Sequence, residues 1–436
     1  MNVLKAQIKD TKAKIIICSY ISRKTVSQAL LELGLSNKVQ VIILEKAQGQ
    51  DEPISEPGFK FFQDFIHGQK FYSLKSERLR DDDVFVIFWS SGTTGNPKGI
   101  QHDVNYARHM IKGYITRGKL SPLFSKYLQT TCYFHIGGFI SPLNTMSAPL
   151  TFVFNHSQDL DELHSTNDLL LKEIDLYKPY LMICGSHHLV QLSTVVGQIS
   201  TEKLDLSSVE LVMPMGSTIP LTLFEDLKKF LPNLNHVYQI YGMTEIGGTL
   251  AWSFNARNLG VVHPDAALKI VDPETGETCG PHQVGEIWAK TSAFMRGYLN
   301  NPAETLKFFA TNGFAHTGDL GHYDEDGIIF FDGRLKDLIK YKNCHLYPIE
   351  IENIICTHPD VIEAGVFGKP DPSVQECVTA LVVKVPNSKV TEQNIIDLVA
   401  EQADDAKKLR GGVKFVEKLP KNPQGKIVRR KLIEML

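Results

Sequence analysis

The sequence predicts an α/β fold. A large N-terminal domain of parallel-rich sheets with helices, plus a β-rich subdomain, is followed by a small α+β C-terminal domain. Short apolar runs alternate with amphipathic stretches in the first half of the chain, which is typical of parallel strands connected by helices. After about Gly260 short strand patterns are separated by turn sequences such as DPETG and DEDG. The C-terminal region has its own helix and strand patterns, and 436 residues are too many for one core.

The first elements follow a β–α–β order. The apolar run AKIIICS at 13–19 predicts a buried strand, and VQVIIL at 39–44 predicts the next one. A helix is expected between them over 26–35, with Gly34 at its end. Pro and Gly in 51–58 indicate a loop. The same apolar pattern predicts further strands at 84–89, 209–214 and 237–240.

The second half of the chain is richer in strands. Short strands are expected at 268–271, 285–289, 327–331, 364–368 and 378–385. A helix over 348–356 begins with Pro348, which fits a first helical turn. Another helix is expected over 390–403, with Thr391 as its N-cap and Glu392 in its first turn. The predicted domains are 1–332 and 337–436.

Composition restricts the class of protein. The formal net charge is -3, so no broad attraction for nucleic acid is expected. The 7 cysteines are odd in number and form no CxxC pair, which favours a reducing compartment. No apolar run reaches the ~20 residues of a membrane helix, and the lysine-rich start is unlike a signal peptide. We therefore expect an intracellular protein, with the cytoplasm as its compartment.

The stretch SSGTTGNPKG at 90–99 directly follows a predicted buried strand. Its small residues present backbone N–H groups and hydroxyls, a surface that can surround a polyanion, and its lysine adds a cation. The GxxxxGK[ST] spacing of the common P-loop is absent. A plain surface loop is the alternative, but we expect a phosphate loop. Its residues are Ser90, Ser91, Gly92, Thr93, Thr94, Gly95 and Lys98.

This loop and four further motifs resemble the adenylate-forming superfamily, which includes acyl-CoA synthetases, 4-coumarate–CoA ligases, beetle luciferases and the adenylation domains of peptide synthetases. The four motifs are YQIYGMTE at 238–245, HTGDLGHYDEDG at 316–327, DGRLKDLIKYK at 332–342 and PKNPQGKIVRRKL at 420–432. They occur in the family's order over nearly the whole chain. The closest similarity is to the luciferase and acyl-CoA ligase branch, which implies a peroxisomal location as the alternative to a cytoplasmic one.

The resemblance implies an acid–thiol ligase that uses ATP, Mg²⁺ and CoA. A carboxylate attacks the α-phosphate of ATP, which gives an acyl-adenylate and pyrophosphate, and the thiol of CoA then takes the acyl group and expels AMP. The implied acid is fatty or aryl, with a medium- or long-chain fatty acid as the expected substrate. No protein partner is expected.

The resemblance assigns the nucleotide site residue by residue. Thr93 and Thr94 would hold the β- and γ-phosphates, with Lys98 opposite their charge. Thr244 would bond the α-phosphate, and Glu245 would coordinate Mg²⁺, a hard cation that prefers carboxylate oxygen. Gly216 and Gly242 would let the backbone approach the nucleotide. Taken alone, each of these residues also has a purely structural explanation, for example a tyrosine packed in the core or an aspartate that caps a turn. The remaining contacts would be Tyr241 on adenine and Asp319 and Arg334 at the ribose.

The implied catalytic groups are two lysines and a histidine. Lys426 would bridge the attacking carboxylate and the α-phosphate. Lys340 would serve thioester formation after the C-terminal domain turns about Lys336. His135 in YFHIGGF aligns with a histidine that orients the acyl substrate, and a packed core histidine is the equal alternative. The basic neighbours of Lys426 leave a solvated tail as its alternative: Lys421, Arg429, Arg430 and Lys431.

The sequence also departs from the family. Only 89 residues precede the loop, so we expect the first part of the N-terminal domain to be missing, through a fragment or a shortened isoform. Glycines are usual in the family at three positions that differ here: Ile240, Thr291 and Asn343. The Ile240 side chain is expected to shorten the acyl pocket, and the Asn343 side chain is expected to narrow the thiol tunnel. Two other functions therefore stay open: a catalytically impaired relative that binds nucleotide, and a luciferase-like monooxygenase.

Overall fold

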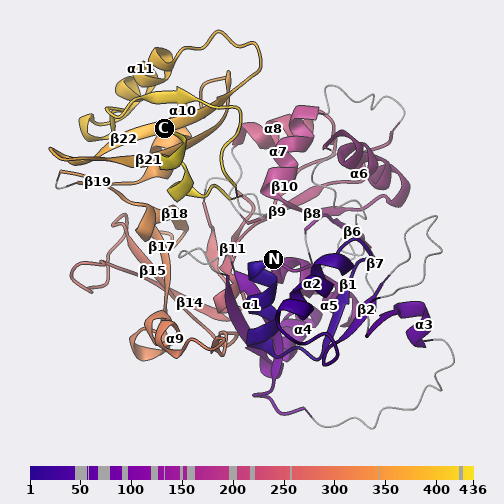
Figure 1. Ribbon diagram of the computed structural model, residues 1–436. Helices are drawn as coiled ribbons and strands as arrows, with labels where there is room; N and C mark the ends of the chain where they lie inside the picture. Colours follow the sequence, from indigo (N-terminus) through magenta and orange to yellow (C-terminus); the bar gives the residue numbers. More distant parts are fainter. Residues whose placement is uncertain are drawn as a thin grey trace.

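The computed structural model confirms the predicted α/β class, with a large N-terminal part and a smaller C-terminal domain (Figure 1). It describes residues 1–44, 56, 58–66, 79–90, 97–118, 126–131, 133–147, 151–154, 163–195, 204–216, 221–255, 258–342, 344–421 and 426–436. Most of the predicted loop 51–58, the phosphate-loop residues 91–96 and Asn343 lie outside these ranges.

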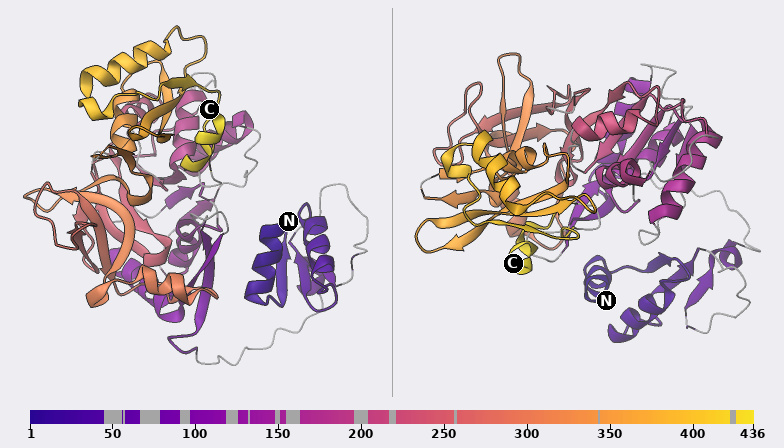
Figure 2. Two further views of the ribbon diagram at one scale, coloured as in Figure 1. Left: turned by 60° about the vertical axis from the view of Figure 1, so that its left-hand side comes forward. Right: turned by 90° about the horizontal axis from the view of Figure 1, so that it is seen from above.

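The chain begins with a three-stranded parallel sheet in the order β1-β2-β3, which lies at the edge of the molecule (Figure 2). Its strands are β1 (Ile15–Cys18), β2 (Gln40–Ile43) and β3 (Phe59–Phe61), and its helices are α1 (Asn2–Thr11), α2 (Arg23–Glu32) and α3 (Phe62–Ile66). The two strands and the helix predicted here are confirmed. The prediction that the first strand is buried was wrong, because only alternate residues face the core beside α1 and α2. Ile15 and Ile17 point away from that core and are 54% and 61% exposed.

The second sheet has five parallel strands in the order β10-β9-β8-β6-β7. The strands are β6 (Lys126–Gln129), β7 (Thr151–Phe154), β8 (Leu181–Gly185), β9 (Leu211–Met215) and β10 (His236–Val237). The helices along it are α5 (Ile136–Ser147), α6 (Leu163–Tyr177), α7 (Ser186–Val195) and α8 (Leu221–Lys228). Apolar residues of β8, β9, α6, α7 and α8 form a large buried core, as expected where helices cover a parallel sheet.

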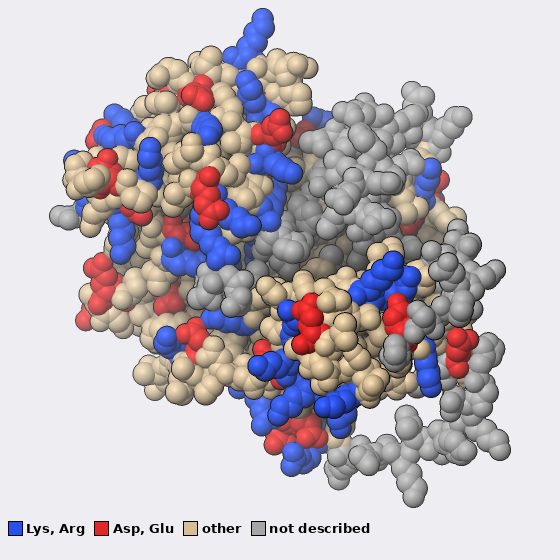
Figure 3. All heavy atoms as spheres, viewed as in Figure 1, with Lys and Arg blue, Asp and Glu red and all other residues tan. Residues whose placement is uncertain are grey.

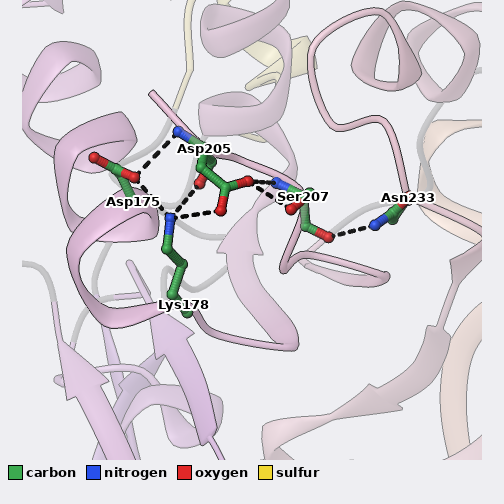
Figure 4. A network of polar contacts seen from close by, with 5 residues as sticks. All are labelled: Asp175, Lys178, Asp205, Ser207 and Asn233. Carbon is green, nitrogen blue, oxygen red and sulfur yellow. Dashed lines mark hydrogen bonds and ion pairs between the residues drawn. The ribbon is translucent and has the colours of Figure 1, made fainter. Parts of the chain in front are cut away.

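A polar network joins the segments that lead into β8, β9 and β10 (Figure 4). Lys178 donates to Asp175 at 2.7 Å and to the carboxylate of Asp205 at 2.9 Å. Ser207 donates to Asp205, and Asn233 donates to the carbonyl of Ser207 at 2.8 Å. This network lies at the amino ends of the strands. Since ligands of parallel sheets bind at the carboxyl ends, we assign it to stability.

Strand β4 (Val84–Ser90) pairs antiparallel with β5 (Lys98–Asp103), and β5 pairs with β16 (Gly297–Tyr298). The strand predicted at 84–89 is confirmed, but the prediction that it is buried was wrong for Val84 and Phe85, which are exposed. The reason is that β4 lies at the edge of a three-stranded sheet instead of inside a parallel one. Helix α4 (Val104–Gly118) follows β5 directly.

The expected β-rich section is present as two antiparallel sheets. One contains β11 (Gln239–Met243), β12 (Gly248–Ser253) and β13 (Val261–Val262), and the other contains β14 (Ala266–Val271), β15 (Gly285–Thr291), β17 (Ala315–Tyr323) and β18 (Ile329–Arg334). The strand predicted at 237–240 is divided between two sheets, since β10 is parallel to β9 whereas β11 pairs with β12. Short helices complete the section: 3₁₀ turns at Thr244–Ile246 and Thr311–Gly313, and α9 (Pro302–Phe308).

The C-terminal domain is built on one sheet in the order β20-β19-β22-β21, with β23 parallel to β22. Its elements are β19 (Ile339–Tyr341), β20 (Cys344–Leu346), β21 (Val361–Asp371), β22 (Gln375–Lys384), β23 (Val413–Phe415), α10 (Pro348–Ile355) and α11 (Glu392–Gln402). Four 3₁₀ turns accompany them: Leu335–Asp337, Asp405–Lys407, Arg429–Lys431 and Ile433–Met435. The predicted domain boundary falls at the end of β18 and in the first of these turns.

Helix α11 begins with the predicted N-cap. The hydroxyl of Thr391 accepts from the backbone N–H of Asn394 at 3.2 Å, and the Asn394 side chain accepts from the Thr391 N–H at 2.9 Å. We expect Thr391→Ala to lower the free energy of unfolding by about 1 kcal/mol, because the N–H of Asn394 loses its acceptor and the hydroxyl of residue 391 no longer donates to the Asn394 side chain. Urea denaturation measures the change. Thr391→Ser is the control and should keep wild-type stability, and an equal loss in both variants would contradict the capping role.

Candidate active site

Two residues predicted to contact adenosine lie side by side. Tyr241 on β11 donates its hydroxyl hydrogen to Oδ2 of Asp319 on β17 at 3.1 Å, and both side chains are buried. The β17–β18 register places Asp319 opposite Arg334, whose Nε lies 3.1 Å from Oδ1 of Asp319. Three side chains from three of the quoted motifs therefore meet on adjoining sheets.

The Asp319 carboxylate retains an unused acceptor. Its Oδ1 is buried and makes no hydrogen bond of suitable geometry with any described residue, although Arg334 is close. Burial raises the pKa of Asp319, and the charges of Arg334 and Lys426 oppose this. A buried acceptor of this kind fits a ligand that brings hydroxyl donors.

Lys426 reaches this site from the C-terminal domain. Its ammonium lies near enough to Arg334, Asp319 and Glu245 for their charges to act on it. Burial first, and then the Arg334 charge, lower the pKa of Lys426 to about 8. His135 directly precedes α5. Burial is the main cause that lowers the pKa of His135 to about 4, and the charge of Lys426 lowers it further. The site thus collects residues from β11, β17, β18 and the C-terminal segment.

The solvated-tail alternative was wrong for Lys426 and Arg429, because both residues are partly buried and the Arg429 side chain is only 19% exposed. Arg430 and Lys431 are exposed, as that alternative expects. His135 is half-buried, and its Nδ1 accepts from the backbone N–H of Gly137 at 3.2 Å. It is therefore a packed histidine that also lies near the Lys426 charge.

Glu245 and Thr244 form a short 3₁₀ turn after β11. The Tyr298 hydroxyl donates to Oε1 of Glu245 at 3.0 Å, and burial raises the pKa of Glu245. The carbonyl of Thr244 lies 2.8 Å from Nε2 of His102. Because a carbonyl only accepts, the proton of His102 is on Nε2. Burial lowers the pKa of His102 to about 4, so the ring is neutral.

Lys98 is the first residue of β5, and Ser90, the last residue of β4, is paired with it across the ladder. The ammonium of Lys98 lies 2.7 Å from Oε2 of Glu304 and 5.0 Å from the centre of the Tyr298 ring. Since Tyr298 also holds Glu245, these side chains connect the end of the predicted phosphate loop to the predicted metal ligand. The other predicted loop residues, Ser91, Gly92, Thr93, Thr94 and Gly95, lie outside the described residues.

The two predicted glycines differ. Gly216 ends β9 with φ +99, a conformation that favours glycine. A Cβ at Gly242 would lie 2.1 Å from the carbonyl oxygen of Gly248. The expectation that Gly242 makes room for a ligand is therefore corrected: its small size is required by the close approach of β12 at an irregularity in the β11–β12 ladder.

The structure does not bring Lys340 to this site. Its side chain is exposed in the middle of β19, and its backbone N–H donates to Glu376 at 2.7 Å. Lys336 is much closer, since the charge of Asp319 acts on it, and burial lowers its pKa. Figure 3 shows Lys and Arg side chains gathered where the C-terminal domain faces the rest of the molecule. Such a cluster attracts polyanions.

Sequence reasoning missed three residues of the site: His102, Tyr298 and Glu304. All three were detectable in principle. His102 lies just after the predicted phosphate loop, and the stretch GYLNNPAET at 297–305, which is also similar to the luciferase and acyl-CoA ligase branch, contains both Tyr298 and Glu304. Within the described residues, no group of three or more His, Cys, Asp or Glu side chains is arranged to hold a metal ion. Mg²⁺ is commonly bound by one or two carboxylates together with waters and substrate phosphates.

Comparison with known proteins gives the family. The AMP-binding enzyme family matches residues 2–299, and the AMP-binding enzyme C-terminal domain matches residues 350–426. The chain therefore belongs to the AMP-binding enzymes, the adenylate-forming superfamily that the motifs predicted, and that family uses ATP and CoA.

Two curated relatives represent its neighbours. The peroxisomal OPC-8:0-CoA ligase 1 of Arabidopsis thaliana is 30% identical over 440 residues, which cover 100% of this chain and 77% of the relative. The luciferin 4-monooxygenase of Nipponoluciola cruciata is 32% identical over 88% of this chain and 71% of the relative.

Solved structures show the same fold. ATP-bound MatB from Rhodopseudomonas palustris superposes with a TM-score of 0.83 at 23% identity, over 99% of this chain and 81% of that one. The anthranilate CoA ligase AuaEII with anthranoyl-AMP superposes with a TM-score of 0.82 at 21% identity, over 100% and 80%. Separately, none of the helices in the described ranges has the length and apolar character needed to span a membrane.

Proposed function

We propose that this protein is an ATP-dependent acid–CoA ligase that activates a carboxylic acid as its acyl-adenylate. The observation that carries the proposal is that Tyr241 and Arg334, from separate motifs, both contact the buried carboxylate of Asp319. The charges of Asp319 and Glu245 also act on the Lys426 ammonium, which comes from a distant motif. One site thus combines a ribose-type acceptor, a carboxylate for a cation and a buried ammonium.

In the first step an oxygen of the acid attacks the α-phosphorus of ATP, and the bond to pyrophosphate breaks. Negative charge builds on the α-phosphate, where the Lys426 ammonium would stabilise it and orient the acid. Asp319 Oδ1 would accept from the ribose hydroxyls, and Tyr241 would pack against the base. Glu245 would hold Mg²⁺ together with phosphate oxygens, and the ion would offset phosphate charge.

In the second step the CoA sulfur attacks the acyl carbon, AMP leaves, and the thiol proton passes to solvent. We place Lys340 in this step, since it is exposed on another face of the C-terminal domain, and Lys336 at the hinge between the two steps. A fatty or aryl acid is the proposed substrate, with medium- or long-chain fatty acids first, and a peroxisomal or cytoplasmic location is proposed with it.

The test is an assay of AMP and pyrophosphate formation with ATP, Mg²⁺, CoA and a panel of fatty, benzoic and cinnamic acids. We expect AMP only when an acid is present, together with the matching CoA thioester. ATP binding by calorimetry without acid-dependent pyrophosphate would favour the impaired relative. Light from a luciferin with oxygen would favour the monooxygenase, which the luciferin 4-monooxygenase relatives keep as the second candidate.

A further prediction concerns the ammonium of Lys98. Glu304 forms an ion pair with it, and the polyphosphate of bound ATP would compete with Glu304 for this cation. The Lys98 ammonium is the main cause that lowers the pKa of Glu304 to about 2, so this carboxylate is ionised at neutral pH. We expect Glu304→Gln to lower the Kd for ATP by about two- to five-fold, because it removes an opposing charge from a partly exposed pair.

Isothermal calorimetry measures this effect in the absence of an acid. Glu325→Gln is a matched control, because Glu325 is an exposed carboxylate paired with His282 in a different part of the chain. Weaker ATP binding by Glu304→Gln would mean that Glu304 supports Lys98 instead of competing for it.

A further inference from the structure

Arg429 lies three residues after Lys426 and is held firmly by the C-terminal domain. Its Nη2 donates to Oε2 of Glu352 at 2.9 Å, its Nη1 pairs with the other Glu352 oxygen, and Nη1 also donates to the carbonyl of Val366 at 2.9 Å. The side chains of Arg429 and Glu352 are only 19% and 11% exposed. A planar guanidinium paired through two bonds to a carboxylate fixes orientation as well as distance.

Glu352 is itself anchored. It is buried in α10, and its Oε1 accepts from the backbone N–H of Val366 on β21 at 2.8 Å. The pair therefore attaches the chain after Lys426 to both a helix and a strand of the domain core. Removal of either partner would leave a charge in a poorly solvated place.

Arg429 also contacts the segment beside the predicted hinge. Its Nε lies 3.2 Å from Oδ2 of Asp337, which directly follows Lys336. The guanidinium thus joins the start of the C-terminal domain to the segment that carries Lys426. When the domain turns about Lys336, these contacts can turn with it as one piece.

The backbone around Lys426 is constrained by the same region. The N–H of Val428 donates to the carbonyl of Pro420 at 2.8 Å, and an antiparallel bridge joins Lys421 to Ile427. Leu432 is buried against Phe367, Leu381 and Leu419. Lys426 therefore directly precedes a segment that is paired with Pro420 and Lys421 and held by Arg429.

We propose that Arg429, through its pair with Glu352, is a positioning residue that sets where the Lys426 ammonium lies. This inference rests on the proposed function, since it assigns Arg429 to the step in which Lys426 acts. It predicts that the pair matters for acyl-adenylate formation and not for transfer of a preformed acyl-adenylate to CoA. A purely structural pair would affect both steps alike.

The experiment measures the two half-reactions separately in the full chain, with an acid that the wild type accepts. Arg429→Ala should slow acid-dependent pyrophosphate release by about 100-fold, as expected for a displaced catalytic group. Arg429→Lys keeps the charge but loses the two-bond geometry, and it should fall between the alanine variant and the wild type. In both variants CoA thioester formation from supplied acyl-adenylate should stay within about two-fold of wild type.

Lys431→Ala, which removes an exposed cation two residues further on, is the control and should leave both steps unchanged. Glu352→Gln should recover part of the rate lost in Glu352→Ala, since an amide still accepts from Val366. A parallel loss of both half-reactions together with thermal stability would overturn the positioning role, and so would an unchanged first step. Absence of pyrophosphate release in the wild type with every acid would instead count against the proposed function.

Discussion

Lys426→Ala is expected to slow acid-dependent pyrophosphate release by about 100- to 1000-fold, the usual cost of losing one transition-state charge donor. The reason is that the charges of Asp319 and Glu245 act on this ammonium, and in the proposed mechanism it stabilises the charge that builds on the α-phosphate. The rate of acid-dependent pyrophosphate release at saturating ATP measures the loss. Calorimetry should still show ATP binding, because the ribose and base contacts remain.

This variant should fold normally. Burial disfavours the charged form of Lys426, so loss of the ammonium removes an unfavourable term from the folded state. We therefore expect an unchanged or raised melting temperature, which separates a catalytic loss from unfolding. A variant that keeps wild-type pyrophosphate release would remove Lys426 from the mechanism.

The pH dependence gives a second measurement on the same residue. The ammonium is the active form, and its pKa is lowered to about 8 in the free protein. The protonated fraction falls from roughly nine-tenths at pH 7 to roughly one-tenth at pH 9. The kcat/KM for acid activation should therefore decline as the pH rises through about 8. In Lys426→Ala this decline of kcat/KM through pH 8 should be absent.

Local patterns predicted the elements well where local chemistry determines them. The capping box of Thr391 uses contacts within one turn, and the motif order placed Tyr241 and Asp319 in one site. The pattern of β1 predicted a strand correctly but not its exposure. The continuous apolar run Ile15–Cys18 is typical of a strand covered on both faces, whereas in the structure Ile15 and Ile17 are exposed and only the alternate residues face the core.

Partners far apart in the chain could not be predicted. Lys98 and Glu304 are separated by 206 positions and meet because β16 pairs with β5, which places the start of α9 beside Lys98. The contact between Arg429 and Glu352 depends in the same way on how the last segment packs on α10. Charge and spacing alone therefore made the C-terminal arginine resemble part of a solvated tail.

Asp319→Asn is the second variant with a large expected effect, and it tests the nucleotide side of the site. We expect the KM for ATP to rise by about 10- to 100-fold, because a charged acceptor for the ribose hydroxyls is replaced by a weaker neutral one. The ribose is held equally in the ground state and the transition state, so kcat should change little. Asp324→Asn is the control, since that partly exposed aspartate accepts the turn N–H groups of Asp326 and Ile328.

The pH dependence separates this role from a structural one. Burial raises the pKa of Asp319, and the carboxylate form is the acceptor. ATP affinity should therefore fall as the pH is lowered through that raised pKa, and the asparagine variant should lack this dependence. A lowered kcat with unchanged KM for ATP would show that Asp319 acts in the chemistry through Arg334 or Lys426, and would move the ribose contact elsewhere in the site.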